Sequence, residues 1–305
     1  MPEPHDVPTT GRHTSADPPA PATGSPDLPD FTDLPDFTYV ETDDLGPGQR
    51  WSTWDEIGVL AGPEPLPPWV VTSDAAVDTE LGILKTGKEA DVFLLERAVP
   101  GRDEEEGCGV VLAAKRYRGL DHRLFHRDAG YTEGRRIRRS RDRRAAAKGT
   151  AWGRTVQAGQ WAAAEFDHLT RLWLVGLPVP YPVQLDGVEI LMELVTLEDG
   201  SGAPRLAQCR PGPELLQRYW DQLTAAMRVM AGLGLAHGDL SPFNLLATEE
   251  RLVLIDLPQA VDVVANPQGV EFLARDCRNV ATWFRARGLE VDADELLADL
   301  LAHAF

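Results

Sequence analysis

The chain has 305 residues, of which 43% are hydrophobic and 26% charged, and its formal net charge is −18 at pH 7. This length suits one large domain or two small ones. No apolar run approaches the roughly 20 residues that span a bilayer, and the N-terminus lacks a basic segment followed by an apolar one. The three cysteines are scattered and odd in number. These features argue against a membrane span, a signal peptide and a disulfide or zinc framework, and a reducing cytoplasm is the expected location.

The negative charge is spread unevenly along the chain. Residues 1–110 hold six Lys and Arg against 23 Asp and Glu, whereas residues 111–154 hold 14 against four. An acidic chain with one basic block is not a general nucleic-acid binder. The densest part of that block, residues 134–149, has three interpretations: salt-dependent contact with RNA or ribosomal surfaces, contact with the chain's own acidic tail, or a solvated flexible loop.

The N-terminal part divides into a tail and a lead-in. Residues 1–50 are rich in Pro, Asp and Thr and contain the hexapeptide DLPDFT twice, at 27–32 and 33–38. Such a composition buries too little apolar surface to offset the entropy of ordering, which predicts a disordered acidic tail. The repeat is either a docking motif or a duplication without a role. Residues 51–80 place tryptophans among prolines, which predicts a lead-in that packs on the folded body.

Hydrophobic periodicity and turn residues predict two groups of elements in the rest of the chain. The first group is mostly strands: a strand, turn and strand over 81–98, a strand over 109–118, a helix over 161–177 and a hairpin over 180–195. The second group is mostly helices, over 213–234, 269–287 and 292–303. The division predicts an α+β fold of two lobes, 81–195 and 196–305, with a flexible basic loop over 118–158 in the first.

Two acids and an amide lie close together in "AHGDLSPFNLLATEERLVLIDLPQA", residues 236–260. Asp239 and Asn244 are separated by four residues, and Asp256 follows a short apolar stretch. In kinases this spacing brings a base, which orients the acceptor hydroxyl, next to two oxygen ligands for Mg²⁺. Each residue alone is more simply a cap or a turn residue. The three together predict a phosphoryl-transfer site.

A lysine and a glutamate upstream complete this pattern. Lys115 lies within the apolar run "VVLAAKRYR", where a charged group is costly unless it is paired. The expected partner is Glu165 in the following helix, and the alternative is an ordinary lysine whose charged end reaches solvent. The order of strand lysine, helix glutamate, catalytic loop and metal aspartate matches a protein-kinase layout.

On these residues the chain resembles the RIO-type atypical serine/threonine protein kinases, as a bacterial-looking member closest to the first RIO subfamily. Four segments carry the resemblance: "KTGKEADVF" at 85–93, "HGDLSPFNLL" at 237–246, "LIDLPQAVD" at 254–262 and "EFLARDCRNVATWF" at 271–284. They cover roughly residues 80–290. The loop at 237–246 also resembles that of small-molecule kinases of the aminoglycoside phosphotransferase type, whereas the segments at 85–93 and 271–284 are specific to the RIO family.

The resemblance implies a bilobal protein-kinase-like fold and an enzyme that uses ATP with Mg²⁺, or with Mn²⁺ in its place. Such an enzyme phosphorylates protein Ser/Thr or itself, or hydrolyses ATP as an assembly switch. The implied roles are a catalytic Asp239, metal ligands Asn244 and Asp256, a Lys115–Glu165 ion pair at the phosphates, a phosphate-covering turn at Gly87, Lys88 and Glu89, and an adenine pocket lined by Met192, Glu193 and Val195. The resemblance also implies that Asp256 can accept a phosphoryl group.

Two departures from the family pattern bear on the function. Pro258 stands where members of the family carry Ser or Gly, and proline removes a backbone donor and fixes φ. No activation segment follows Asp256, which leaves the protein substrate unknown. Two other functions therefore stay open: a small-molecule kinase, and a non-catalytic, ATP-gated binding factor. The basic block lies where the family inserts a flexible loop.

Overall fold

The structure of the protein is a computed structural model that describes residues 45–56, 58–118 and 151–305. The predicted tail up to residue 44, with its DLPDFT repeat, and the basic block at 134–149 lie outside the described residues. All described residues belong to one compact unit. Within it, no helix is long and apolar enough to cross a membrane.

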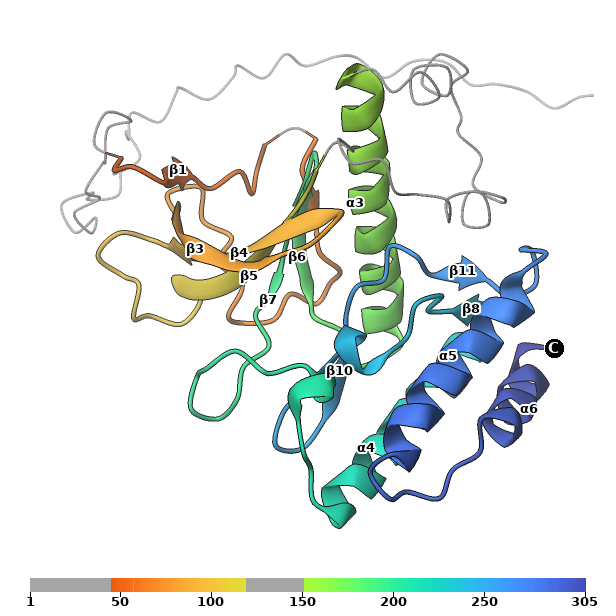
Figure 1. The fold of residues 1–305 in the computed structure, drawn as a ribbon. Helices are drawn as coiled ribbons and strands as arrows, with labels where there is room; N and C mark the ends of the chain where they lie inside the picture. Colours follow the sequence, from red (N-terminus) through yellow and green to blue (C-terminus); the bar gives the residue numbers. More distant parts are fainter. Residues whose placement is uncertain (1–44, 57, 119–150) are drawn as a thin grey trace, which may run out of the picture. The chain divides into compact units, whose positions relative to one another are not determined.

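The first half of the described chain forms a seven-stranded antiparallel sheet (Figure 1). Its strand order is β1–β3–β4–β5–β7–β6–β2. The strands are β1 (Gln49–Trp51), β2 (Leu60–Ala61), β3 (Val77–Thr86), β4 (Ala90–Ala98), β5 (Gly109–Tyr117), β6 (Pro182–Asp186) and β7 (Glu189–Glu193). Helix α3 (Ala151–Leu174) runs alongside the sheet and contacts β5, β6 and β7.

The turn between β3 and β4 is tight enough to require glycine. The Gly87 N–H donates to the Ala90 carbonyl at 3.0 Å. A Cβ atom added to Gly87 would lie 2.7 Å from that same carbonyl oxygen, closer than real Cβ contacts allow. The predicted strand, turn and strand over 81–98 are therefore present, and glycine at position 87 brings the two strand ends together.

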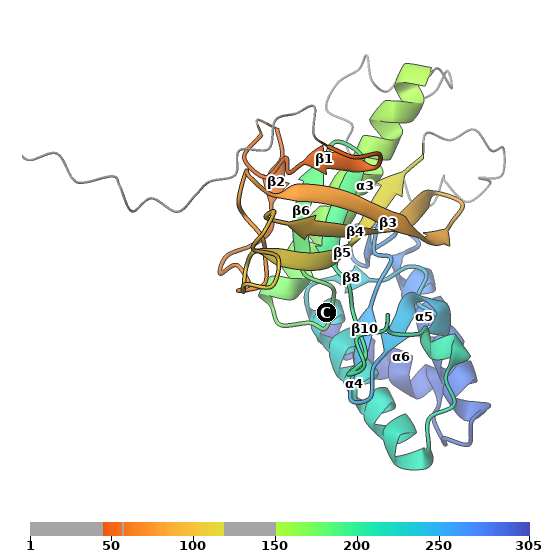
Figure 2. The same cartoon turned by 90° about the vertical axis from the view of Figure 1, so that its left-hand side faces the viewer.

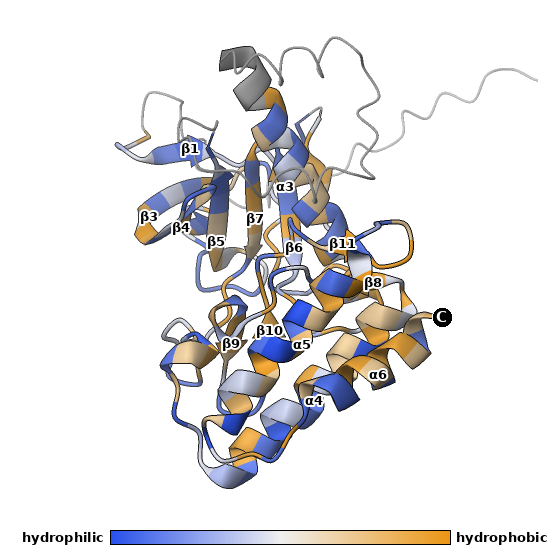
Figure 3. Cartoon of the chain, turned by 45° about the vertical axis from the view of Figure 1, so that its right-hand side comes forward, coloured by the Kyte–Doolittle hydropathy of each residue, from blue (hydrophilic) through white to orange (hydrophobic). Residues whose placement is uncertain are grey.

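The second half is mostly helical (Figure 2). Two short antiparallel strand pairs contact these helices. Helices α4, α5 and α6 carry both apolar and polar residues (Figure 3), and α6 contacts the other two. Their bounds are α4 (Pro213–Gly232), α5 (Gly269–Arg285) and α6 (Ala293–Ala304). The short elements are η3 (Leu206–Gln208), β8 (Leu235–Ala236) paired with β11 (Val261–Asp262), η4 (Pro242–Asn244), and β9 (Leu245–Ala247) paired with β10 (Leu252–Leu254). The predicted α+β division is confirmed.

The structure differs from the sequence expectation at two boundaries. Helix α3 begins at Ala151, so part of the expected flexible loop over 118–158 is helical. Residues 151–160 include two glycines, a valine and a threonine, which are weak helix formers, and buried Ala158 shows that packing supports this turn. The expected lead-in contributes β1, which already begins at Gln49, and β2. Trp54 and Trp69 from it pack on one face of the sheet.

A buried ion pair fixes the sheet near this lead-in. The Arg97 guanidinium is fully buried and donates to both carboxylate oxygens of Asp78, at 2.7 and 2.9 Å. It also donates to Gln184 Oε1 at 2.7 Å, and the Gln184 amide donates to Thr53 Oγ1 at 2.9 Å. Because β4 and β6 are not neighbours in the sheet, these bonds show that it curls around the pair.

Replacing Asp78 by alanine is expected to lower the free energy of unfolding by about 3–5 kcal/mol, because it leaves the buried Arg97 charge without its carboxylate. Denaturant unfolding measures this loss. The matched control is Glu105→Ala, which removes the partner of exposed Arg102 and should change stability little. Equal effects of the two substitutions would contradict a structural role for the buried pair.

Candidate active site

Three charged residues that are far apart in the sequence meet between the sheet, α3 and the segment after β10. The Lys115 Nζ lies 2.7 Å from Glu165 Oε1 and 2.7 Å from Asp256 Oδ1. Burial lowers the pKa of Lys115, but attraction by the two carboxylates outweighs it, so the net pKa is raised. Burial raises the pKa of Asp256, and attraction by Lys115 reverses the shift, so the net pKa is lowered. Both groups are therefore charged near neutral pH.

Glu165 is held by three donors. Its carboxylate accepts from Lys115 Nζ, from the Tyr117 hydroxyl and from the Leu257 N–H at 3.2 Å. Burial and the nearby Glu165 charge raise the pKa of Tyr117 well above its usual value, which keeps this hydroxyl a donor. Glu165 itself is buried. Because the Glu165 carboxylate is buried and accepts from three donors, it is held in one orientation. It fixes the Lys115 ammonium group in turn.

Helix α3 binds both the N–H and the carbonyl of Leu257. One turn after Glu165, the His168 Nδ1 lies 3.1 Å from the Leu257 carbonyl oxygen, to which it donates. The Leu257 N–H already donates to Glu165, and its side chain is fully buried. Pro258 follows and has no N–H to give. Leu257 therefore bonds α3 to residues 254–262, called the metal loop because they carry the expected metal ligand Asp256, and these two bonds do not need a donor at position 258.

Asp256 adopts an uncommon backbone conformation. It is the one non-glycine residue of the described ranges with a positive φ, 68°. A non-glycine residue with a positive φ costs free energy relative to the usual backbone conformations. Such conformations are found preferentially at functional sites. The bonds from Glu165 and His168 to the next residue, Leu257, hold this conformation. The Asp256 side chain is 41% exposed. Its Oδ1 contacts Lys115, and within the described ranges its Oδ2 has no hydrogen-bond partner.

Helix α5 holds the loop that carries Asp239. The buried Asp276 carboxylate accepts the N–H groups of Gly238 and Leu240, both at 2.8 Å, and Asn279 Nδ2 donates to the Leu240 carbonyl at 3.0 Å. These contacts grip the backbone on both sides of Asp239. Among the described residues, no hydrogen bond or ion pair holds the Asp239 side chain itself.

Replacing Asp276 by alanine is expected to cost about 2–5 kcal/mol of unfolding free energy, because two buried N–H groups lose their acceptor. Phosphotransfer should fall more steeply than the folded fraction, since the loop that carries Asp239 loses its support. Thermal unfolding and single-turnover kinetics measure the two effects. The control is Glu271→Ala, an exposed acid on the same helix. A variant with full activity would contradict the positioning role.

The two expected metal ligands lie on segments that are bonded to each other. The Asn244 side-chain nitrogen donates to the Asp239 carbonyl at 2.9 Å, so its Oδ1 is the atom that can ligate a metal. The Asn244 carbonyl accepts the Ile255 N–H at 3.1 Å, one residue before Asp256. The described residues contain no cluster of three or more His, Cys, Asp and Glu suited to a metal. Two oxygen ligands fit Mg²⁺, which keeps waters and binds substrate phosphates.

The phosphate-loop residues lie at the tip of the β3–β4 hairpin. Glu89 reaches the segment after Asp256, where Gln259 Nε2 lies 3.4 Å from its carboxylate. Burial, with repulsion from Asp256, raises the pKa of Glu89. Lys88 is exposed in the same turn as Gly87. The hairpin tip is thus joined to the metal loop through Glu89, and Lys88 makes no ion pair within the described residues.

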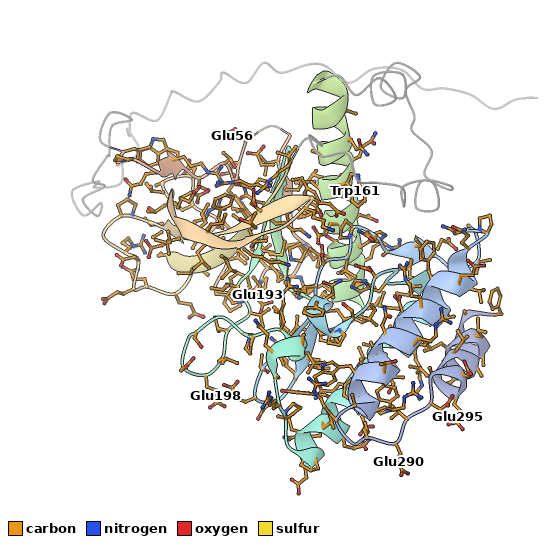
Figure 4. The ribbon with its side chains drawn as sticks, viewed as in Figure 1. Glu56, Trp161, Glu193, Glu198, Glu290 and Glu295 are labelled. Carbon is orange, nitrogen blue, oxygen red and sulfur yellow. The ribbon has the colours of Figure 1, made fainter. Side chains whose placement is uncertain are left out.

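The expected adenine segment begins with the last two residues of β7, Met192 and Glu193, and continues to Val195 as the chain leaves the sheet for the helical half (Figure 4). Met192 is buried. The Glu193 N–H donates to the Tyr181 carbonyl at 2.9 Å, and its carboxylate accepts the Tyr181 N–H at 3.0 Å. The Val195 carbonyl accepts the Ala203 N–H at 2.9 Å, and in the described part of the chain the Val195 N–H has no hydrogen-bond partner. Among the described residues, the Val195 N–H is thus an open backbone donor at the end of this segment.

Sequence reasoning missed several residues that the structure brings to this place. Tyr117 lies two residues after Lys115 on the same strand, so strand periodicity could have found it. Asp276 lies in a segment that was noticed only for its resemblance. His168, Lys85 and Arg205 had no signal of their own, because their positions depend on how distant segments pack.

Comparison with known proteins identifies the family. A family model described as the RIO domain matches residues 122–296, more than half of the chain. The RIO-type serine/threonine-protein kinase Rio1 of Haloferax volcanii is 37% identical over 226 residues, which cover 74% of this chain and 70% of that protein. The chain belongs to the RIO kinase family. The sequence-based resemblance is thereby confirmed.

Other RIO kinases match over a smaller share of their length. Serine/threonine-protein kinase RIO1 of Saccharomyces cerevisiae is 28% identical over 232 residues, 71% of this chain and 46% of that protein. The Caenorhabditis elegans RIO1 is 37% identical over 132 residues, 43% of this chain and 26% of that protein. The chain thus spans less than half of these eukaryotic RIO kinases. Among solved structures, the Rio2 kinase–ADP/Mg²⁺–phosphoaspartate complex of Chaetomium thermophilum has a TM-score of 0.49 and 22% identity, covering 73% of this chain and 65% of that one.

Proposed function

We propose that this RIO kinase is an ATP- and Mg²⁺-dependent phosphotransferase that phosphorylates serine or threonine on a protein or on itself. The observation that carries the proposal is the placement of Lys115 between Glu165 and Asp256, each at 2.7 Å. A lysine held in this way presents a fixed positive charge beside a carboxylate that faces solvent. Phosphoryl transfer needs such an arrangement, because catalysis consists largely of positioning and of neutralising the phosphates.

Each residue of the site has a part in this proposal. Asp239 accepts the proton of the incoming hydroxyl, and Asn244 and Asp256 hold Mg²⁺, or Mn²⁺ in its place. Lys115 contacts the phosphates and Glu165 orients it. When bound, the metal ion neutralises the phosphate oxygens. The turn at Gly87, Lys88 and Glu89 covers the phosphates, and the backbone at Met192, Glu193 and Val195 receives the adenine.

Two alternative functions have less support. The chain after Asp256 forms α5 and α6, and α5 already holds the catalytic loop through Asp276 and Asn279, which leaves little of it to build an acceptor pocket for a small molecule. An ATP-gated binding factor would show turnover without a labelled acceptor. RNA or ribosomal contact through the basic block, and the cytoplasmic location, stay predictions; RNA binding at two salt concentrations tests the former.

The decisive experiment follows the label from γ-labelled ATP. The protein is incubated with ATP and Mg²⁺, alone and with cell lysate, and the labelled residues are identified by acid stability and peptide mapping. We expect acid-stable label on serine or threonine. Label found only as inorganic phosphate, or on an acid-labile aspartyl phosphate, would support the assembly switch instead. Absence of both ATP binding and turnover would refute the proposal.

A further inference from the structure

Two cations beside the site have no part in the function proposed so far. Lys85 lies near the end of β3, and Arg205 directly precedes η3 in the segment that follows the adenine region. We propose that Lys85 and Arg205 bind the phosphate chain of the nucleotide, one from the sheet and one from the helical half. The inference rests on the proposed function, because it names further residues that recognise a nucleoside polyphosphate at that site.

A β-bulge brings Lys85 to the face of the sheet that carries Lys115. Ile83 pairs with Phe93, whose side chain packs on the opposite face with Trp54 and Trp69. Strict alternation from Ile83 would place Lys85 on that face too. The register shifts between the two residues, so that Lys85 pairs with Val92. An extra residue in one strand re-aims the side chains that follow it.

The register of the next strand then aligns Lys85 with Lys115. Val92 pairs with Lys85 on one side and with Lys115 on the other. Residues directly opposite each other in antiparallel strands project from the same face. Two strand spacings separate the backbones of the two lysines by about 10 Å. A lysine side chain covers much of that distance, so both ammonium groups can reach one triphosphate.

Arg205 reaches the same place from the other half of the molecule. Its backbone forms a bridge with Leu246, two residues after Asn244. Leu246 pairs in turn with Val253, three residues before Asp256. The Arg205 backbone is therefore anchored next to both segments that carry the proposed metal ligands, and its guanidinium lies close enough to Asp256 to be attracted by it. Burial lowers its pKa, and attraction by Asp256 acts in the opposite direction.

The charge of these two residues is not balanced locally. The described arginines up to residue 118, in the sheet strands and the segments next to them, each have a carboxylate within 4.0 Å, at positions 50, 97, 102, 116 and 118. Across the described ranges, neither Lys85 nor Arg205 has one. Burial lowers the pKa of Lys85, repulsion from Arg205 lowers it further, and attraction by Asp256 opposes both effects only in part. Two partly desolvated cations that repel each other favour a bound anion, and phosphate oxygens are strong acceptors for both.

The test separates phosphate recognition from nucleoside recognition. Calorimetric titration compares adenosine, Mg²⁺–ADP and a Mg²⁺-bound non-hydrolysable ATP analogue on the full chain. We expect Lys85→Met and Arg205→Leu each to weaken binding of the ATP analogue by about tenfold, while adenosine binding stays within about twofold of the parent protein. Lys85→Arg, which keeps the charge, should bind the analogue nearly as the parent does. Arg102→Leu is the matched control, since it removes one exposed charge from the connection between β4 and β5.

The outcomes distinguish this inference from the proposed function. If the parent protein binds no nucleotide, the proposed function fails. If the parent binds the ATP analogue and both neutral variants bind it equally well, the assignment of Lys85 and Arg205 is wrong while the proposed function stands. A neutral variant could also lose adenosine binding, and the thermal midpoint then shows whether it is still folded. If the midpoint is unchanged and Lys85→Arg does not restore binding of the ATP analogue, the assignment is likewise overturned.

Discussion

Phosphotransfer by the Asp256→Ala variant is expected to fall at least about 10³-fold, because the variant loses one of two proposed metal ligands and the carboxylate that faces Lys115. Mg²⁺-dependent nucleotide binding should fall with it. The measurements are single-turnover phosphotransfer and nucleotide binding with Mg²⁺ and with EDTA. In the parent protein EDTA should weaken nucleotide binding, whereas in the variant it should change little.

The fold should survive this substitution. Lys115 keeps Glu165 at 2.7 Å, so its buried charge stays paired. The φ of 68° at position 256 is costly for alanine as well as for aspartate, which leaves the local strain in place. Circular dichroism and the thermal midpoint provide the check. Retained activity in a folded Asp256→Ala protein would refute the site.

Replacing Asp239 by alanine is expected to remove phosphotransfer and to spare nucleotide binding. The loss should lie in kcat, at about 10²–10⁴-fold, which is the usual range for a general base. The dissociation constant for Mg²⁺–ATP should change by less than about twofold, because the Asp239 contact to Asn244 uses the backbone carbonyl, which alanine retains.

The experiment on Asp239 needs a readout for each half of this expectation. Binding is measured by titration with the Mg²⁺-bound ATP analogue, and chemistry by rapid mixing with labelled ATP. Asp221→Ala, an exposed acid on α4, is the control for loss of a charge. Loss of ATP binding in a folded Asp239→Ala protein would count against the base role and would place Asp239 among the nucleotide or metal contacts.

Local pattern predicted the parts of the fold that depend on short segments. The strands at 81–98 and 109–118, and the helix that became α4, carry strong periodicity and clear turn residues. The contact between Lys115 and Glu165 was predictable too, since a lysine inside an apolar strand requires a partner. The spacing of Asp239, Asn244 and Asp256 predicted the segments that the structure brings together, although their chemical roles stay proposals.

Other features could not be predicted because they depend on packing between distant segments. The first turns of α3 include two glycines, a valine and a threonine, so their helicity depends on what they contact. The bulge before Lys85 is a one-residue shift of register, and the same sequence read with strict alternation places that lysine on the other face. The role of Asp276 in holding the loop around Asp239 could not be predicted. From sequence alone, a carboxylate on a helix cannot be told apart from a polar surface residue, and only the packing of the helix buries it.

The two bonds from α3 to Leu257 limit how this kinase can be switched off. In an inactive form that moves only the metal loop, the Leu257 N–H would lose its bond to Glu165 and the Leu257 carbonyl its bond to His168. The groups left without a partner would be buried. Each unmade bond of this kind costs about 1–3 kcal/mol, so such a form would hold about one molecule in thirty or fewer. We therefore expect the metal loop and α3 to move together. A regulator that displaces the helix displaces Asp256 with it, and a regulator that touches the loop alone works against both bonds.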